Sequence, residues 1–344
     1  MISSYLNEYL GLNLKRRIRV ERIIRVGTRG SQLATTQTKQ AMAEIKERYP
    51  NIQLELIEIV TKGDRLKDHS LTTIGGQGAF VKEIEHQLLA KEIDIAIHSL
   101  KDLPTVIPNE LEIGCTLKRK SPYDCLIVKD KHYNLETLPK GAKVGTSSLR
   151  RQSQLLKIRP DLDILPLRGN IDTRIKRLVE GHYDAIMLAH AGIQRLAVSE
   201  DDVFFNVLTS KECLPAIGQG ALALQCRKED MEVLKLLNSM EDKETRQAVE
   251  AERAFLRTMD GSCTFPIGGF ARIESKQVIV EGMISNYNGT EMIREICRHE
   301  DPIEAGRLLG EKLLNQGAER LIRECQSYVK NNPLHTGRLM PGSY

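Results

Sequence analysis

Apolar and polar positions in the first hundred residues switch repeatedly between the spacing of a strand and that of a helix. The expected elements are strands at 23–28, 53–60 and 93–99, a helix from about 31 to 49, and a helix with Phe80, Ile84 and Leu88 on one face. This order of strands and helices predicts an α/β fold that begins with a β-α-β unit.

Two segments in the second half of the chain echo segments in the first half. The stretch "VGTSSLRRQSQL" at 144–155 is similar to "VGTRGSQL" at 26–33, and "DAIMLAHAG" at 184–192 is similar to "DIAIHSLKD" at 94–102. The spacing between the two pairs differs, so either a duplication or similar strand patterns could explain them. We expect two similar α/β lobes.

The remaining part of the chain predicts a third, smaller α/β domain. Long charged helices are expected after "LPAIGQGALALQC" at 214–226, followed by strand-like segments after "DGSCTFPIGGF" at 260–270. One amphipathic helix is expected near 302–329. The polar segment 61–78 has no apolar period, which predicts a mobile lid or a margin of a cleft.

Composition narrows the classes of function. The 344 residues are 41% hydrophobic and 28% charged with a net charge of +4, as in a soluble protein without general attraction to nucleic acid. The aromatic content of 4% also disfavours nucleic-acid binding. No apolar run could span a membrane and the start lacks an export signal, so we expect a cytoplasmic protein. The seven cysteines are scattered, which argues against a zinc ribbon or a disulfide framework, and no metal site is expected.

Arginines gather where predicted strands lead into helices. They are Arg29, Arg150, Arg151, Arg168 and Arg174. Helix N-termini attract anions, and the guanidinium fork binds carboxylates or phosphates in a bidentate manner. One such arginine could be a solvated surface residue, but five predict a cleft for a polyanionic ligand. The sequence contains no phosphate-binding loop motif, although a phosphate ligand stays open at this point.

Three further positions carry candidate chemistry. Lys101 and Asp102 are expected in a turn at the carboxyl end of a strand, because Pro104 discourages a helix there. Asp102 could cap a turn or stabilise positive charge on a substrate. Cys263 lies in a turn framed by glycine and proline, where an accessible thiol could be a nucleophile or an attachment point. His98 and His190 end the echoing strands, and we expect both to be structural.

Seven motifs, in this order, resemble the hydroxymethylbilane synthase family, also called porphobilinogen deaminases. They are "GTRGSQLA", "TKGDR", "IHSLKDLPT", "VGTSSLRRQSQLL", "LRGNIDTR", "LPAIGQGA" and "DGSCTFPIG". The resemblance implies two α/β domains like those of periplasmic binding proteins and a smaller C-terminal α/β domain that carries the cofactor cysteine. The implied limits are 23–118 with 218–238 for domain 1, 119–217 for domain 2 and 239–330 for domain 3, between an N-terminal extension, 1–22, and a tail, 331–344.

The resemblance also implies a transferase. The family condenses four porphobilinogen molecules head to tail onto a covalent dipyrromethane cofactor, loses ammonia at each step, and releases hydroxymethylbilane by hydrolysis for tetrapyrrole and haem biosynthesis. Asp102 would stabilise the cationic azafulvene formed when ammonia leaves, and Lys101 would assist cofactor binding. The cofactor, attached through Cys263, would contact Lys101, Asp102, Ser31, Thr146, Ser147, Ser148, Arg150, Arg151, Arg168 and Gly169. The substrate would contact Arg29, Arg150, Arg174, Arg195, Phe80 and Gln219.

Some features depart from the family pattern. Ser262 replaces a frequent glycine before the cysteine, Gln77 replaces a frequent lysine, and Tyr123 lies in "SPYDC" where "DPRDA" is usual.

The expected partner is the small molecule porphobilinogen, without nucleic acid or membrane, and we expect a monomer. A non-catalytic binding module of two lobes is the main alternative, which Cys263 and the third domain disfavour.

Overall fold

The computed structural model describes residues 22–60, 81–199, 201–259 and 265–331. The expected lid at 61–78, which includes Gln77, lies outside the described residues. So do Phe80, Ser262 and Cys263. None of the described helices is both long enough and apolar enough to span a bilayer.

The first lobe contains a five-stranded sheet in the order β2-β1-β3-β10-β4. The strands are β1 (Ile24–Arg29), β2 (Leu54–Ile59), β3 (Ile95–Ser99), β4 (Leu111–Thr116) and β10 (Leu222–Arg227), and the helices are α2 (Gln32–Arg48), α4 (Lys82–Leu89) and α8 (Met231–Asn238). Strand β1 pairs in parallel with β2 and β3, whereas β10 is antiparallel to β3 and β4. The expected β-α-β beginning is therefore confirmed.

The second lobe contains a sheet of the same pattern, in the order β7-β6-β8-β5-β9. Its strands are β5 (Asp124–Val128), β6 (Lys143–Gly145), β7 (Asp163–Leu165), β8 (Ala185–Ala189) and β9 (Phe204–Val207), and its helices are α5 (Leu149–Ile158), α6 (Ile171–Val179) and α7 (His190–Leu196). Here β6 pairs in parallel with β7 and β8, and β5 is antiparallel to β8 and β9. The echoing sequences thus occupy equivalent strands, β1 with β6 and β3 with β8, and the two similar lobes are confirmed. His190 begins α7 instead of ending a strand.

Two crossing segments, 117–123 and 208–221, lie side by side and connect the lobes. Strand β10 joins the first sheet only after the chain has completed the second lobe, so the chain crosses between the lobes twice. The crossing segments are hydrogen-bonded, with the Lys120 amide 3.2 Å from the Gly220 carbonyl oxygen. Gly220 has a φ of 90°, and a Cβ there would lie 2.6 Å from the Lys120 oxygen. Only glycine fits this close approach of the two crossing segments.

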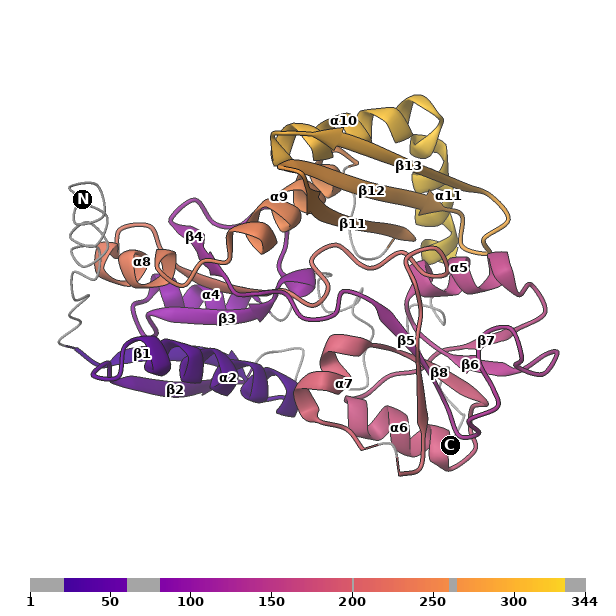
Figure 1. Cartoon of the computed structure of the whole chain (residues 1–344), viewed down its shortest axis with the longest axis horizontal. Helices are drawn as coiled ribbons and strands as arrows, with labels where there is room; N and C mark the ends of the chain where they lie inside the picture. The colour runs from indigo at the N-terminus through magenta and orange to yellow at the C-terminus, as the bar shows by residue number, and fades with distance from the viewer. Residues whose placement is uncertain (1–21, 61–80, 200, 260–264, 332–344) are drawn as a thin grey trace, which may run out of the picture.

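The third domain packs α9 (Lys243–Thr258) and α10 (Pro302–Asn315) against a sheet of β11 (Ile267–Glu274), β12 (Gln277–Ser285) and β13 (Met292–His299). Phe255 is fully buried in its core. The expectation of one helix near 302–329 was wrong. The chain forms α10 and α11 (Ala318–Asn331), because Gly317 adopts a φ of 97° that ends the first helix. Figure 1 shows this domain above the two lobes, with α9 reaching towards the first lobe.

A buried carboxylate ties the third domain to the crossing segments. Glu252 on α9 is 0% exposed and accepts hydrogen bonds from the Arg119 guanidinium and from the backbone amides of Gly218 and Ala271, the latter two at 2.7 and 2.9 Å. The Arg119 guanidinium also lies 5.2 Å from the ring centre of Phe270, which lies 6.0 Å from the ring of Tyr123. Tyr123, one of the departures from the family pattern, therefore lies at the end of the first crossing, beside Phe270 of the third domain.

Candidate active-site cleft

A cavity of about 520 Å³ lies between the lobes. Its described lining contains six cationic side chains and one carboxylate. These are Arg29, Lys101, Arg151, Arg168, Arg174, Arg195 and Asp102. Ser31, Ser147, Ser148 and Gly169 line it as well. A second cavity of about 180 Å³ adjoins it towards the third domain and shares Lys101, Asp102, Ser148 and Arg151 with it. The cleft therefore brings together most of the residues selected from the sequence.

Lys101 and Asp102 lie on a single 3-10 turn, Leu100–Asp102, directly after β3. The turn begins at the carboxyl end of the strand, where α/β folds present ligand-binding groups, as expected. The Asp102 side chain is exposed, and within the described residues its carboxylate accepts no hydrogen bond and forms no ion pair. Lys101 is half-buried and lies within 3.4 Å of the Gln219 side-chain oxygen. The turn thus presents an exposed carboxylate beside an ammonium group.

The environment of Lys101 makes its ammonium group unusually acidic. Burial lowers the pKa of Lys101 from its ordinary value of 10.5 to about 8, and the nearby positive charges of Arg151 and Arg150 act in the same direction. Asp102 and Asp124 raise the pKa but do not cancel the burial effect. An anionic ligand in the cleft would therefore stabilise the charged form of Lys101.

Arg29 and Ser31 connect the first strand to the first helix of lobe one. Arg29 is the last residue of β1, and Ser31 is the N-cap of α2, with its hydroxyl oxygen accepting a hydrogen bond of 3.3 Å from the Ala34 amide. The cap satisfies one amide of the first helical turn, and Arg29, Ser31 and Gln32 all line the cavity. This helix end is suited to an anion, as the sequence predicted.

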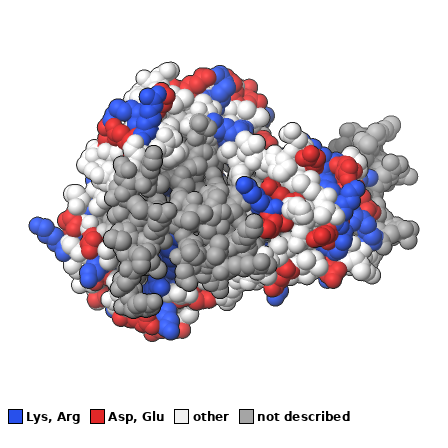
Figure 2. All heavy atoms as spheres, turned by 180° about the vertical axis from the view of Figure 1, so that it is seen from behind, with Lys and Arg blue, Asp and Glu red and all other residues white. Residues whose placement is uncertain are grey.

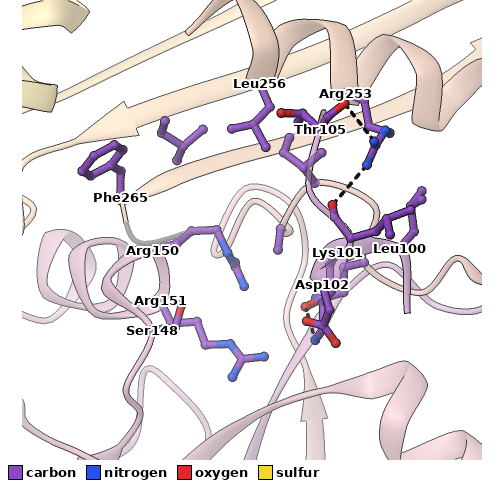
Figure 3. A pocket seen from close by; sticks show the side chains of 15 residues that line it. Leu100, Lys101, Asp102, Thr105, Ser148, Arg150, Arg151, Arg253, Leu256 and Phe265 are labelled. Atoms are coloured by element: carbon purple, nitrogen blue, oxygen red, sulfur yellow. Dashed lines mark hydrogen bonds between the residues drawn. The ribbon is translucent and has the colours of Figure 1, made fainter. Parts of the chain in front are cut away.

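Arg150 and Arg151 begin α5 in lobe two and share one buried counter-ion, Asp124. Asp124 is 0% exposed and lies 2.6 Å from Arg150 Nη1 and 2.7 Å from Arg151 Nη2. Both arginines also donate to backbone oxygens, those of Leu214 and Met187. Figure 3 shows the two guanidinium groups directed from α5 towards Lys101 and Asp102 across the smaller cavity. The pair is thus held in place, with one carboxylate for two positive charges.

The pair Arg150 and Arg151 strongly lowers the pKa of Asp124. Although burial alone would raise the pKa of Asp124, the charges and hydrogen bonds of Arg150 and Arg151 hold it far below its ordinary range. Gln219, 1% exposed, donates to Asp124 Oδ1 at 3.0 Å and accepts from Lys101, so its amide bridges the two sides of the cleft. Asp124 was not selected from the sequence. The signal was a charged residue at the start of an otherwise apolar strand, "DCLIV".

The three hydroxyl residues after β6 have different surroundings. Thr146 is buried and does not line either cavity, and its hydroxyl oxygen accepts a hydrogen bond from the Ser148 amide at 3.2 Å. The Ser147 hydroxyl exchanges hydrogen bonds of 3.1 Å with the backbone of Leu167, which joins this loop to the loop that carries Arg168. Ser148 is the N-cap of α5 without a side-chain capping bond, and it lines both cavities.

The far wall of the cleft is formed by Arg168, Gly169 and Arg174 around the start of α6, and by Arg195 on α7. Arg174 Nε donates to the Gly169 oxygen at 2.7 Å. Burial lowers the pKa of both Arg174 and Arg195 to about 10, and the neighbouring cations Arg151 and Arg168 add to the effect on Arg174. Arg195 Nε is buried and has no hydrogen-bond partner within the described residues. This wall therefore offers donors that a carboxylate could accept.

The two histidines selected from the sequence differ: His98 has a side-chain partner, whereas the buried Nδ1 of His190 has no hydrogen-bond partner within the described residues. His98 is buried, its Nε2 lies 3.0 Å from the Gln225 side-chain oxygen, and burial lowers its pKa to about 4. It is therefore neutral at physiological pH. Burial also lowers the pKa of His190. In the described parts of the chain, no three His, Cys, Asp or Glu side chains gather as a metal site would require.

The outer surface differs from the cleft in its charge. Figure 2 shows Lys and Arg interspersed with Asp and Glu over the described part of the rear face. Most basic side chains of the third domain have acidic partners, such as Lys312 with Glu295 at 2.6 Å. The described surface on this face is thus mixed in charge, whereas the described lining of the cleft is mostly cationic.

Comparison with known proteins gives a consistent result along the chain. The family model described as porphobilinogen deaminase, dipyromethane cofactor binding domain, matches residues 24–235, and the model of the porphobilinogen deaminase C-terminal domain matches residues 246–315. Curated porphobilinogen deaminases of Bacillus pumilus and Staphylococcus aureus are each 47% identical, over 88% and 87% of this chain and 96% of each relative. Among solved structures, an ancestral cationic amino acid solute binding protein is 17% identical over 63% of this chain and 87% of its own, with a TM-score of 0.39.

Proposed function

The chain belongs to the porphobilinogen deaminase family, and from this premise we propose how the described residues divide the work of the reaction. The activity is hydroxymethylbilane synthesis: four porphobilinogen molecules are condensed head to tail with loss of ammonia, and the linear tetrapyrrole is released by hydrolysis. The cofactor is dipyrromethane. When bound, it supplies the covalent primer to which substrate units are joined.

The residues of the cleft fit such a cofactor. Each pyrrole unit carries an acetate and a propionate, and the larger cavity offers six cationic side chains against the single carboxylate of Asp102. Arg195 Nε is a buried donor without a partner in the described part of the chain, and the pKa values of Lys101 and Arg174 are lowered by burial. Each of these features would be relieved by a ligand carboxylate. This excess of positive charge in the cleft is the observation that carries the proposal.

Asp102 and Lys101 are the proposed catalytic residues. As ammonia leaves the substrate, positive charge develops on its pyrrole ring, and the exposed carboxylate of Asp102 stabilises that charge. The absence of a side-chain partner for Asp102 in the described residues leaves both oxygens available for pyrrole N–H groups. Lys101 holds a ligand carboxylate beside Asp102, and the Gln219 amide keeps Lys101 directed towards the cleft.

The remaining residues bind carboxylates. Cofactor binding is assigned to Ser31, Thr146, Ser147, Ser148, Arg150, Arg151, Arg168 and Gly169, and substrate binding to Arg29, Arg150, Arg174, Arg195, Phe80 and Gln219. For Thr146 and Ser147 the support is indirect, since their hydroxyls hydrogen-bond to backbone groups of the cleft loops. Arg150 and Arg151 keep a net positive charge after pairing with Asp124, which leaves them able to attract an anion.

Cys263 is the proposed attachment point of dipyrromethane. It lies outside the described residues, but Phe265, two residues further along the chain, lines the smaller cavity together with Lys101, Asp102 and Arg150. Two residues of extended chain span only about 7 Å. A thiol within that distance of Phe265 could carry a group that extends into the cationic cleft.

The domain limits and the assembly complete the proposal. Domain 1 comprises 23–118 and 218–238, domain 2 comprises 119–217 and domain 3 comprises 239–330, which agrees with the return of β10 to the first sheet. We also propose that the protein acts as a monomer. A biosynthetic enzyme with a small-molecule substrate is expected in the cytoplasm.

The test uses porphobilinogen and the purified holoenzyme. Ammonia release and tetrapyrrole formation should proceed together, and the intact mass of the denatured protein should exceed the sequence mass by one dipyrromethane, mapped to Cys263. The Cys263→Ser variant should lack this addition and the activity. Active enzyme with an unmodified Cys263 would refute the attachment, and folded holoenzyme that gives no tetrapyrrole would refute the activity.

A further inference from the structure

The direction of the Asp102 carboxylate depends on its backbone. In the described residues no side chain contacts this carboxylate through a hydrogen bond or an ion pair. The start of its turn is fixed, because the Leu100 amide donates to the Ala221 oxygen at 3.0 Å and the Leu103 amide closes the turn on the Leu100 oxygen at 3.1 Å. The contacts that fix the other end of the turn therefore influence the direction of the Asp102 carboxylate.

The chain after the turn has no regular secondary structure until β4 begins at Leu111. Pro104 has no amide hydrogen, and the side chain of Val106 is 78% exposed, so neither a strand ladder nor this side chain anchors the segment. Three successive carbonyl oxygens of the segment instead accept hydrogen bonds from one residue of the third domain. Arg253 on α9 donates to Leu103 at 3.2 Å, to Pro104 at 2.7 Å and to Thr105 at 3.2 Å.

Arg253 is suited to this task by its shape and its burial. Its side chain is 7% exposed, and within the described part of the chain it forms no ion pair. A planar guanidinium can reach several carbonyl oxygens at once, which a lysine ammonium on a flexible stem does less well. Burial lowers the pKa of Arg253 to about 10, with the charges of Arg257 and Arg246 acting in the same direction, so it stays protonated at neutral pH. Figure 3 shows its bonds converging on the segment that follows Asp102.

We propose that Arg253 is a positioning residue for Asp102: by holding the carbonyl groups of Leu103, Pro104 and Thr105, it fixes the turn from which the carboxylate extends into the cleft. The proposal rests on the catalytic role proposed for Asp102. It gives the third domain a second task besides carrying the attachment site, because α9 fixes the geometry of a turn in lobe one. A displacement of about 1 Å in a reacting group can reduce a rate about 100-fold, so loss of this support should affect turnover.

The test compares Arg253→Met and Arg253→Lys with the wild type, all as holoenzymes. Arg257→Met is the matched control, since Arg257 is exposed on the same helix one turn away. We expect Arg253→Met to reduce kcat about 10- to 100-fold with KM changed by less than about twofold. Arg253→Lys should recover part of this loss, and Arg257→Met should leave both parameters unchanged. A normal kcat in Arg253→Met, or equal changes in kcat and in the fraction of folded protein, would overturn the proposal.

A double-mutant cycle with Asp102→Glu separates positioning from general destabilisation. Glutamate keeps the charge but moves the carboxylate by one methylene group. The position that the turn gives to the carboxylate is therefore already lost. If Arg253 acts through Asp102, Arg253→Met should reduce kcat by less than about twofold in the Asp102→Glu background. An equal reduction in both backgrounds would mean that Arg253 acts elsewhere. If Asp102→Glu alone leaves kcat unchanged, the role proposed for Asp102 fails, independently of the Arg253 result.

Discussion

The two lobes have the same strand order but differ in how they hold charged side chains at the cleft. Lobe two presents Arg150 and Arg151, which are buried and held by Asp124 and by backbone oxygens. Lobe one presents Asp102, whose carboxylate is exposed and has no side-chain partner in the described residues. The difference supports the proposal that Arg150 and Arg151 bind anions from fixed positions, whereas Asp102, for which we propose a role in stabilising developing charge, is left available to the substrate.

Removal of the charge in lobe one should give the largest effect. Asp102→Asn keeps the shape of the side chain but cannot offset positive charge on the substrate, so kcat should fall by about 10²- to 10³-fold. Stability should change little, because the wild-type carboxylate makes no bond to the described part of the protein. Turnover is measured by tetrapyrrole formation and stability by thermal unfolding. Near-normal turnover would remove Asp102 from its proposed role.

Removal of the Asp124 charge in lobe two should mainly reduce the stability of the protein. Asp124→Asn leaves the buried guanidinium groups of Arg150 and Arg151 without a counter-ion, which should reduce the free energy of unfolding by about 3–5 kcal/mol and impair cofactor loading. The pKa of Asp124 in the folded state lies below its unfolded value, so its stabilisation is present at neutral pH and is lost only as the pH falls below about 4. Urea unfolding at pH 7 is therefore the appropriate measurement.

Asp161→Asn is the control for this prediction. Asp161 pairs with Arg159 in the same lobe at 2.6 Å, but both side chains are partly exposed. Water can replace much of this pair, so the urea midpoint should move far less than in Asp124→Asn. Equal shifts in the two variants would show that Asp124 is not the counter-ion that holds the arginine pair.

The sequence predicted the two lobes and many residues that line the cleft, but not the residues that hold those side chains and turns in place. Strand periods and the two pairs of echoing segments, "VGTRGSQL" with "VGTSSLRRQSQL" and "DIAIHSLKD" with "DAIMLAHAG", locate residues at the carboxyl ends of strands, where the fold brings them together. Asp124 and Arg253 were missed because their importance comes from contacts between residues that are 26 and 150 positions apart. The break at Gly317 was missed because the apolar pattern continues across it, while the left-handed backbone at this glycine interrupts the helix.

The titration of Lys101 should show the smallest effect of these predictions, but it measures directly how the charges of both lobes act on one side chain. Its pKa of about 8 in the cofactor-free chain is set by burial and by the arginines of lobe two, while Asp102 of lobe one raises it. About half of the Lys101 amines should therefore be neutral at pH 8, against about 1 in 300 for a lysine with the ordinary value of 10.5. Competitive acetylation of apoenzyme over a range of pH, with the exposed Lys140 as reference, should show an inflection near pH 8 for Lys101. Asp102→Asn should move the inflection to lower pH because it removes an attractive charge, whereas cofactor loading should move it to higher pH because carboxylates favour the ammonium form. An inflection near 10.5 in the apoenzyme would contradict the effect of burial and of the lobe-two arginines on Lys101. No movement in either case would contradict its electrostatic coupling to Asp102 and to ligand carboxylates.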